Sequence, residues 1–193
     1  MSDSSPGTGF VDLRRSAAAI GHLAWVELRL FELLGGWVQV VPELDVKLAF
    51  AKQSYHHAWH AELLQDRLPT VPDADPGSLV QPANDGVRTL LDSIAGASTA
   101  ETTIEKLVGV YRVLVPLKVA AYEGWLAASS PVADGPLRRA IGFVLLDESA
   151  DLAEGEELLE ARFVTDPGAR TRADAWAAHL GAGTSGSDVT ITG

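Results

Sequence analysis

Three of the five histidines in this chain lie within five positions, in the stretch SYHHAWHAEL at residues 54–63. Neutral imidazole is a common ligand of iron, zinc, copper and nickel, so this spacing raises the question of a metal site. The alternative is that the rings fill the interior of a helix, where other polar groups pair with them. The choice depends on which side chains the fold places beside them.

Two carboxylates fall where helices are expected to bury apolar side chains. At about 100° per residue, Glu27 lies at the centre of the apolar stripe of the helix predicted over 10–38, and Glu148 at the centre of the stripe predicted over 134–164. Asp151 lies at the edge of the same face as Glu148. An unpaired buried carboxylate costs several kcal/mol, so these positions predict a bound metal or a charged partner. The two stripes are formed by Leu13, Ile20, Leu23, Phe31, Leu34 and Val38, and by Leu137, Ile141, Val144, Leu145, Leu152 and Leu159.

The central histidine of the stretch occupies a similar position. His57 lies in the middle of the apolar stripe of the helix predicted over 43–68, and His60 flanks it on the same face. Glu27 and His57 are at similar distances from the turn between the first two helices, so we expect them to face each other. The stripe around His57 is formed by Val46, Phe50, Leu64 and Leu68.

The lengths of the connections predict how the helices pair. The first and second helices, like the third and fourth, are joined by a few residues, so each pair should form an antiparallel hairpin. Between the hairpins, residues 69–100 are rich in Pro, Gly and Asp, with one short helical piece over 86–94. Long structureless loops are uncommon inside compact domains, so we expect a crossover that runs the length of a bundle. The four predicted helices cover 10–38, 43–68, 101–128 and 134–164.

The chain length of 193 residues indicates one domain. We expect a flexible N-terminus over 1–9 and the helical bundle over 10–164, with the crossover at 69–100. Residues 165–193 should form a short helix, over 169–180, and a mobile tail.

This order of helices and charges resembles the ferritin-like superfamily, whose two-metal members carry one Glu on each of two helices and Glu-x-x-His on the other two. The stretch HHAWHAELLQDRLP is also similar to ferritin-like proteins of actinobacterial type. The resemblance covers 10–164 and implies an all-α, ferritin-like four-helix bundle of two antiparallel hairpins joined by a long crossover. By position, it implies that the metal ligands are Glu27, His57, His60, Glu123, Glu148 and Asp151.

The chain departs from the family pattern at two places. Gln53 and histidines stand in the region of the bridging Glu of the second helix, and Asp151 stands where the fourth helix of the family has His. These changes weaken the expectation of a two-iron centre that activates oxygen. A single ion or an asymmetric pair fits the residues about as well.

The predicted function is metal binding, with iron or manganese as the expected ion and a non-haem oxidoreductase as the expected enzyme class. In that mechanism carboxylates hold the metal, histidines complete its coordination, and open positions admit O2 or peroxide. The sequence does not identify a small-molecule substrate. The alternative is a metal-free ferritin-like scaffold that acts as a protein interaction or ligand-binding subunit, with Glu27, Glu148, His57 and Arg112 satisfying one another.

A second apolar strip on the helix over 43–68 predicts a contact surface. It would pack under the crossover or against another subunit, and we expect a homodimer. The strip is formed by Leu48, Tyr55, Trp59 and Leu63.

The composition excludes several classes of function. The formal net charge of −11 argues against nucleic acid and against anionic membrane surfaces. The absence of cysteine excludes disulfides and thiolate metal sites. No secretory signal and no long uncharged apolar run is visible, so we expect a cytoplasmic protein without a membrane span.

Overall fold

The computed structural model describes residues 13–70, 72, 75–184 and 189–192, and within them every regular element is a helix. The all-α prediction is therefore confirmed for this part of the chain, and the N-terminus predicted over 1–9 lies outside it. The α-helices are α1 (Leu13–Trp37), α2 (Leu44–Gln65), α3 (Pro76–Leu79), α4 (Asp85–Ala95), α5 (Thr103–Val108), α6 (Val115–Ala128), α7 (Gly135–Thr165) and α8 (Ala169–Thr184).

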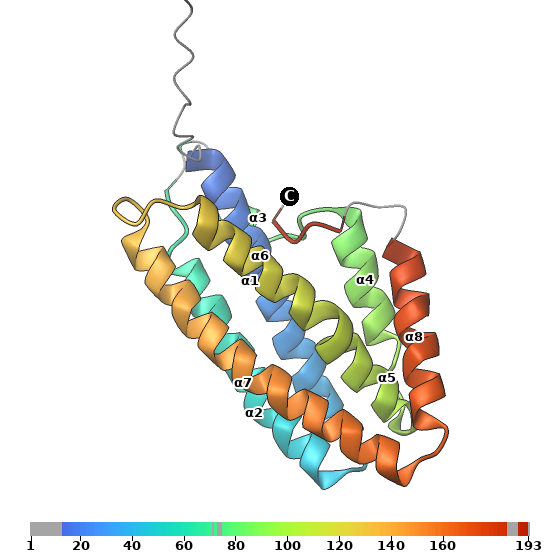
Figure 1. The fold of residues 1–193 in the computed structure, drawn as a ribbon. Helices are drawn as coiled ribbons and strands as arrows, with labels where there is room; N and C mark the ends of the chain where they lie inside the picture. Colours follow the sequence, from blue (N-terminus) through green and yellow to red (C-terminus); the bar gives the residue numbers. More distant parts are fainter. Residues whose placement is uncertain (1–12, 71, 73–74, 185–188, 193) are drawn as a thin grey trace, which may run out of the picture.

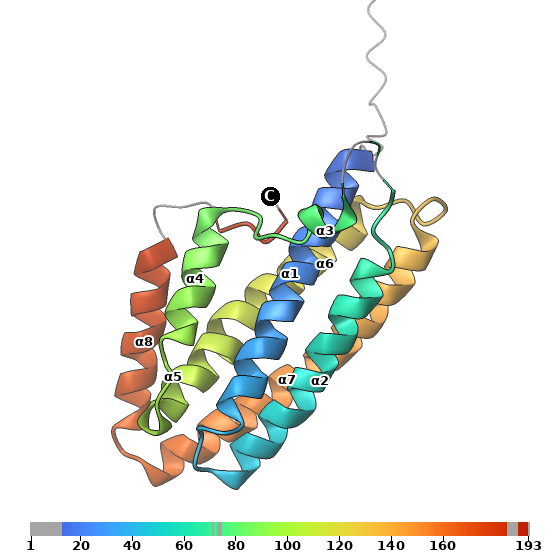
Figure 2. The ribbon, with the colours of Figure 1, turned by 180° about the vertical axis from the view of Figure 1, so that it is seen from behind.

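Helices α1, α2, α6 and α7 lie side by side. Figures 1 and 2 show α1 running antiparallel to α2, and α6 running antiparallel to α7. Helix α2 also packs against α7, so side chains from different hairpins meet between them. This arrangement brings the faces predicted to carry buried charge toward one another.

The connection between the hairpins follows the length of these helices. It contains α3 and then α4, which corresponds to the short helical piece predicted over 86–94. Helix α3 crosses α1 closely: a Cβ atom built on Gly21 would lie 2.1 Å from the backbone oxygen of Leu79. A side chain at position 21 would thus push the connection away from α1.

The third long segment is not a uniform α-helix. A short 3-10 helix (Ala100–Thr102) precedes α5, and a π-helix (Gly109–Leu114) joins α5 to α6. Pro116 follows directly, has no backbone N–H to donate to the carbonyl of Arg112, and would crowd that carbonyl in a regular α-helix. The wider π-turn accommodates this defect and rotates the faces of α6 relative to those of α5.

The buried face of α1 differs in part from the predicted stripe. Ile20, Leu23 and Leu34 are buried as expected, whereas Phe31 is 42% exposed and Leu13 is 50% exposed. Leu30 takes the buried position beside Glu27 instead. The stripe is therefore rotated slightly from the predicted one, and Glu27 remains at its centre.

Helix α8 and the last described residues cover the open side of α4 and α5. Helix α8 packs on both, as Figure 1 shows. Ile191 is buried, the Asn84 side chain donates to the carbonyl of Thr190 at 3.0 Å, and His22 Nδ1 lies 3.2 Å from the carbonyl of Thr192. We expected a mobile tail from the composition; residues 189–192 have these contacts with the helical body.

The second apolar strip of α2 is exposed at one end and packed at the other. Leu48 and Tyr55 are 62% and 71% exposed, while Trp59 lies against Phe143 of α7, with ring centroids 6.2 Å apart. No helix among the described residues has the length and apolarity needed to cross a membrane. The homodimer stays a prediction.

Candidate metal centre

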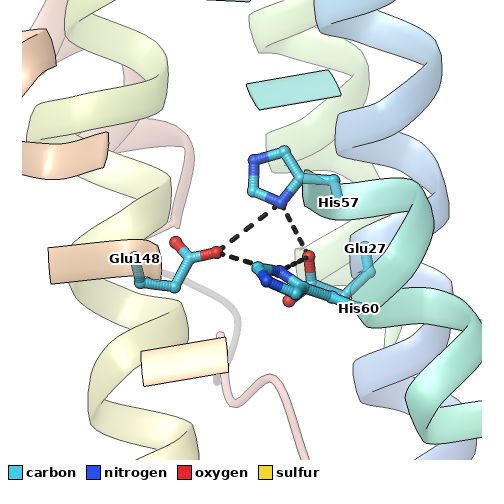
Figure 3. Close-up of side chains that lie close together, drawn as sticks. All are labelled: Glu27, His57, His60 and Glu148. Atoms are coloured by element: carbon cyan, nitrogen blue, oxygen red, sulfur yellow. Dashed lines mark hydrogen bonds and ion pairs between the residues drawn. The ribbon is translucent and has the colours of Figure 1, made fainter. Parts of the chain in front are cut away.

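Four titratable side chains from three helices meet in the interior. Glu27 comes from α1, His57 and His60 from α2, and Glu148 from α7, and all four are at most 2% exposed. Each offers one ligand atom, and these atoms all lie within 4.8 Å of one another. Figure 3 shows Glu148 reaching in from one side and Glu27, His57 and His60 from the other.

Three of the distances between the donor atoms suit a single metal ion. His60 Nδ1 lies 3.5 Å from both Glu27 Oε2 and Glu148 Oε1, and His57 Nδ1 lies 3.6 Å from Glu148 Oε1. A tetrahedral ion with ligands at about 2.0–2.2 Å needs donor atoms about 3.3–3.6 Å apart. A further pair, His57 Nδ1 and Glu27 Oε2, is a hydrogen bond of 2.7 Å and would have to lengthen for an ion to enter.

The helical spacing explains why these four residues converge. His57 and His60 are three positions apart on α2, so their side chains leave the helix on one face. Glu27 and Glu148 are each surrounded by buried apolar residues on their own helices. The expectation that Glu27 and His57 face each other is confirmed by their hydrogen bond.

A buried lysine that we did not assign to the site completes it. Lys118 of α6 is 0% exposed, and its Nζ lies 2.6 Å from Glu148 Oε1, 3.1 Å from Glu27 Oε1 and 3.3 Å from His57 Nδ1. Burial alone would lower the pKa of Lys118, but the two carboxylates outweigh it and raise that pKa. Lys118 therefore supplies a positive charge to the interior.

Tyr122 closes the site from the same helix. Its hydroxyl donates a short hydrogen bond to Glu27 Oε1, and the side chain is fully buried. Burial, together with the negative charge of Glu27, raises the pKa of Tyr122 well above its usual value. Tyr122 therefore remains a hydroxyl donor that holds one carboxylate oxygen in place.

The charges of the site balance one another. Burial raises the pKa of Glu27 and Glu148, but the nearby Lys118 ammonium and the histidines outweigh it and hold the pKa of both carboxyls below the usual value. Burial lowers the pKa of His60, yet the carboxylates of Glu148 and Glu27 raise it to about 10. Without a metal, the two carboxylates thus face one ammonium and one imidazolium.

One ring nitrogen of the site lacks a hydrogen-bond partner. His60 Nε2 lies 3.1 Å from Asp147 Oδ2, a geometry in which Nε2–H donates to the carboxylate. His60 Nδ1 is then directed at Glu27 and Glu148, but has no hydrogen-bond partner among the described residues. A lone pair facing two carboxylates needs a cation between them, either a proton or a metal ion. The donor set therefore fits a metal.

A second polar network lies beside the site, at the next level of the helices. Asp151 is buried there and pairs with His56 Nδ1 at 2.8 Å, and is not one of the four grouped residues. Gln53 donates to Glu154 at 2.8 Å and accepts a 2.6 Å hydrogen bond from the Tyr111 hydroxyl. Asp151, predicted as a ligand, thus belongs to this network. It lies three positions beyond Glu148 on α7, and at that level of the helix it meets His56.

Glu123, the other predicted ligand, does not reach the site. It is on the exposed side of α6, with Pro116 and Ala120, while Lys118 and Tyr122 hold the buried positions. The π-helix at Gly109–Leu114 shifts α6 out of the register of α5. Glu27 was identified as a charged residue at the centre of an apolar helical stripe. The same criterion identifies Lys118, since Leu114 and Tyr122 lie four positions to either side of it.

Arg112, the alternative partner for the buried carboxylates, points elsewhere. Its guanidinium makes two hydrogen bonds to Glu156, at 3.0 and 3.2 Å. The charge that neutralises Glu27 and Glu148 is therefore that of Lys118 and not that of an arginine.

The site thus combines two carboxylates, two imidazoles, an ammonium and a hydroxyl in the interior of an all-helical protein. This set can hold a metal ion, and it can also neutralise itself with protons. No known protein family, no curated protein and no solved structure matches the chain. Its function therefore has to be argued from these residues.

Proposed function

We propose that the protein binds one divalent metal ion through Glu27, His57, His60 and Glu148. The observation that carries this proposal is the convergence of four buried ligand atoms within 4.8 Å of one another, one of them His60 Nδ1, which has no hydrogen-bond partner among the described residues. Two carboxylates neutralise the charge of a divalent ion, and two imidazoles complete four protein ligands.

The architecture supports a ferritin-like bundle as the scaffold of this site. Helices α1 and α2 form one antiparallel hairpin and α6 and α7 the other, with the connection through α4 between them (Figure 1). Ferritin-like proteins build their metal sites from inward-facing Glu and His on such helices. The present site uses the same two residue types on three of the four helices.

Iron or manganese is the expected ion, and an oxidoreductase is the expected activity. Mixed imidazole and carboxylate ligands suit iron, and carboxylates shift the preference toward harder ions such as manganese. A bound iron or manganese ion would supply one-electron chemistry. The protein holds Glu27 in position through Tyr122 and fixes Nε2 of His60 through Asp147. The burial of all four ligands keeps bulk water away from the ion.

One observation favours a second candidate, a metal-free scaffold. Lys118 already contacts Glu27, His57 and Glu148, and an imidazolium at His60 makes the group neutral. Such a self-neutralised network would define the packing of the helices without any ligand. The two candidates differ in a measurable quantity, the amount of metal that the folded protein retains.

The deciding experiment is metal content after reconstitution. Untagged protein would be loaded anaerobically with Fe(II), or with Mn(II) or Zn(II), desalted and analysed by plasma mass spectrometry. We expect about one ion per chain in the wild type and much less in Glu27→Gln and His57→Gln. Glu123→Gln is the matched control, because this carboxylate is exposed on the same bundle.

Circular dichroism and thermal unfolding show whether each variant is folded. Wild-type protein that retains none of the three ions would exclude the metal-binding proposal and favour the metal-free scaffold. Equal retention by Glu27→Gln and Glu123→Gln would place any bound ion outside this group.

A further inference from the structure

Helix α6 contributes a cation to the site where the expected pattern has a carboxylate. Lys118 Nζ contacts both grouped carboxylates, at 2.6 Å from Glu148 Oε1 and 3.1 Å from Glu27 Oε1, while Glu123 is exposed. We propose that the Lys118 ammonium is a permanent second cation of the centre, which bridges Glu27 and Glu148 in place of a second metal ion and restricts the site to one. This inference rests on the proposed metal binding.

The ligands that a second ion would need are engaged elsewhere. The amide of Gln53 is held on both sides, by the Tyr111 hydroxyl and by Glu154. Asp151 is paired with His56. Two metal ions close together are usually held by bridging carboxylates, and here Glu27 and Glu148 already bridge to Lys118.

The net charge of the site also favours one metal ion over two. Glu27 and Glu148 together carry two negative charges, which one divalent ion offsets, and the Lys118 ammonium adds one positive charge. Asp147, hydrogen-bonded to His60, can balance that remaining charge. A second divalent ion would leave two uncompensated positive charges in a fully buried site, which is strongly unfavourable.

The described contacts of Lys118 with the site involve three of the four proposed ligands. Lys118 Nζ has contacts to Glu27, His57 and Glu148. His60 Nδ1, the fourth donor, has no hydrogen-bond partner in the described part of the chain. A single ion held from the His60 side would share both carboxylates with the ammonium.

The test is the number of Mn(II) ions bound per chain. Wild-type protein, Lys118→Met and Lys118→Glu would be titrated with Mn(II), and bound metal counted by mass spectrometry after desalting. Electron paramagnetic resonance separately distinguishes an isolated Mn(II) ion from a coupled pair. Lys106→Met is the matched control, because Lys106 is also 0% exposed but bonds to Thr99 and Thr102, away from the site.

We expect one magnetically isolated Mn(II) per chain in the wild type and in Lys106→Met. Lys118→Glu, which replaces the ammonium with a carboxylate, should bind two ions with a coupled spectrum. Lys118→Met should still bind one ion, about tenfold or more tightly, because a like charge beside the ion is removed.

Two ions in the wild type would overturn this inference and leave metal binding intact. No ion in the wild type but one in Lys118→Met would show that the ammonium occupies the position of the ion itself, which overturns the inference and the proposed function together. No ion in any folded variant would do the same. If Lys118→Met does not fold, the wild-type count and the Lys118→Glu count still decide between one metal ion and two.

Discussion

Lys118 Nζ lies 2.6 Å from Glu148 Oε1, and both side chains are fully buried. This pair explains how the interior of an all-helical protein contains ionised carboxylates. The attraction of an ammonium at this distance in a water-poor interior outweighs the burial that would otherwise keep Glu148 protonated. Glu27 benefits from the same ammonium, so one lysine supports carboxylates on two other helices.

Replacement of Lys118 by methionine should destabilise the metal-free protein. The change leaves two buried carboxylates opposite one imidazolium, and loss of one partner of a buried ion pair costs about 3–5 kcal/mol. For a chain of this size, the melting temperature should fall on the order of 10 °C. The double variant Lys118→Met/Glu148→Gln removes one charge of each sign and should recover part of the loss. A melting temperature that is unchanged in Lys118→Met would show that the pair contributes little.

The stability of the metal-free protein should depend on pH through His60 and the carboxylates. The pKa of His60 is raised to about 10, so its contribution is complete below 6.5, declines above that pH and is lost near 10. Glu27 and Glu148 have lowered pKa values, so their contribution is complete above 4.5 and declines as the pH falls. The contribution of the site is therefore largest between 4.5 and 6.5.

Urea unfolding of wild type and His60→Gln at a series of pH values tests this dependence. The difference in unfolding free energy between the two proteins should shrink as the pH rises from 6.5 to 10. A direct measurement is the titration of the His60 ring by NMR, compared with Glu148→Gln, in which its pKa should move down. A His60 pKa near 6.5 in the wild type would contradict the proposed charge balance.

Replacement of Asp147 by asparagine should weaken metal binding without removing a ligand. Asp147 Oδ2 lies 3.1 Å from His60 Nε2 and fixes the tautomer that leaves Nδ1 free for the ion. Loss of such a partner typically reduces metal affinity about 10–100-fold. Competition with a chelator of known affinity measures this change in Kd. Glu157→Gln, an exposed change on the same helix, should leave the Kd unchanged.

Replacement of Gly155 by alanine should disturb the polar network next to the site. A Cβ atom at Gly155 would lie 2.3 Å from the ring of Tyr111, whose hydroxyl holds Gln53. Overpacking of this kind costs about 1–3 kcal/mol. Gly142 is the control on the same helix: nothing lies within 4 Å of its Cβ position, so Gly142→Ala should be neutral or stabilise α7 by up to about 1 kcal/mol. Thermal unfolding of both variants distinguishes a specific clash from a general effect on α7.

The positions of the long helices, and of three of the four grouped ligands within them, follow from local periodicity. Buried faces recur about every 3.6 residues, so Glu27, His57 and Glu148 can be identified as polar residues at apolar positions without knowledge of the fold. His60 lies one turn from His57 and shares its face. These properties depend on short stretches of the chain, which is why the sequence is sufficient to predict them.

Periodicity fails where the helix itself changes. The π-helix at Gly109–Leu114 inserts a wider turn, and the face that a regular α-helix would bury differs from the face that α6 buries. Glu123 was expected as a ligand from the family resemblance alone, and Lys118 was passed over although Leu114 and Tyr122 lie four positions to either side of it. An irregular turn depends on Pro116 and on the packing of its surroundings, which a regular helical period does not describe.

The sequence by itself determined an all-helical protein and the residue types of the candidate metal site, since helix formation and burial pattern are local. Only the tertiary structure decided which atoms meet. It paired Asp151 with His56 and directed His60 toward Glu27 and Glu148. It also brought Lys118 between those carboxylates, although Glu148 is 30 positions and Glu27 91 positions away from it in the chain. These contacts depend on how α1, α2, α6 and α7 are rotated against one another, and that rotation is set by the packing of all the helices.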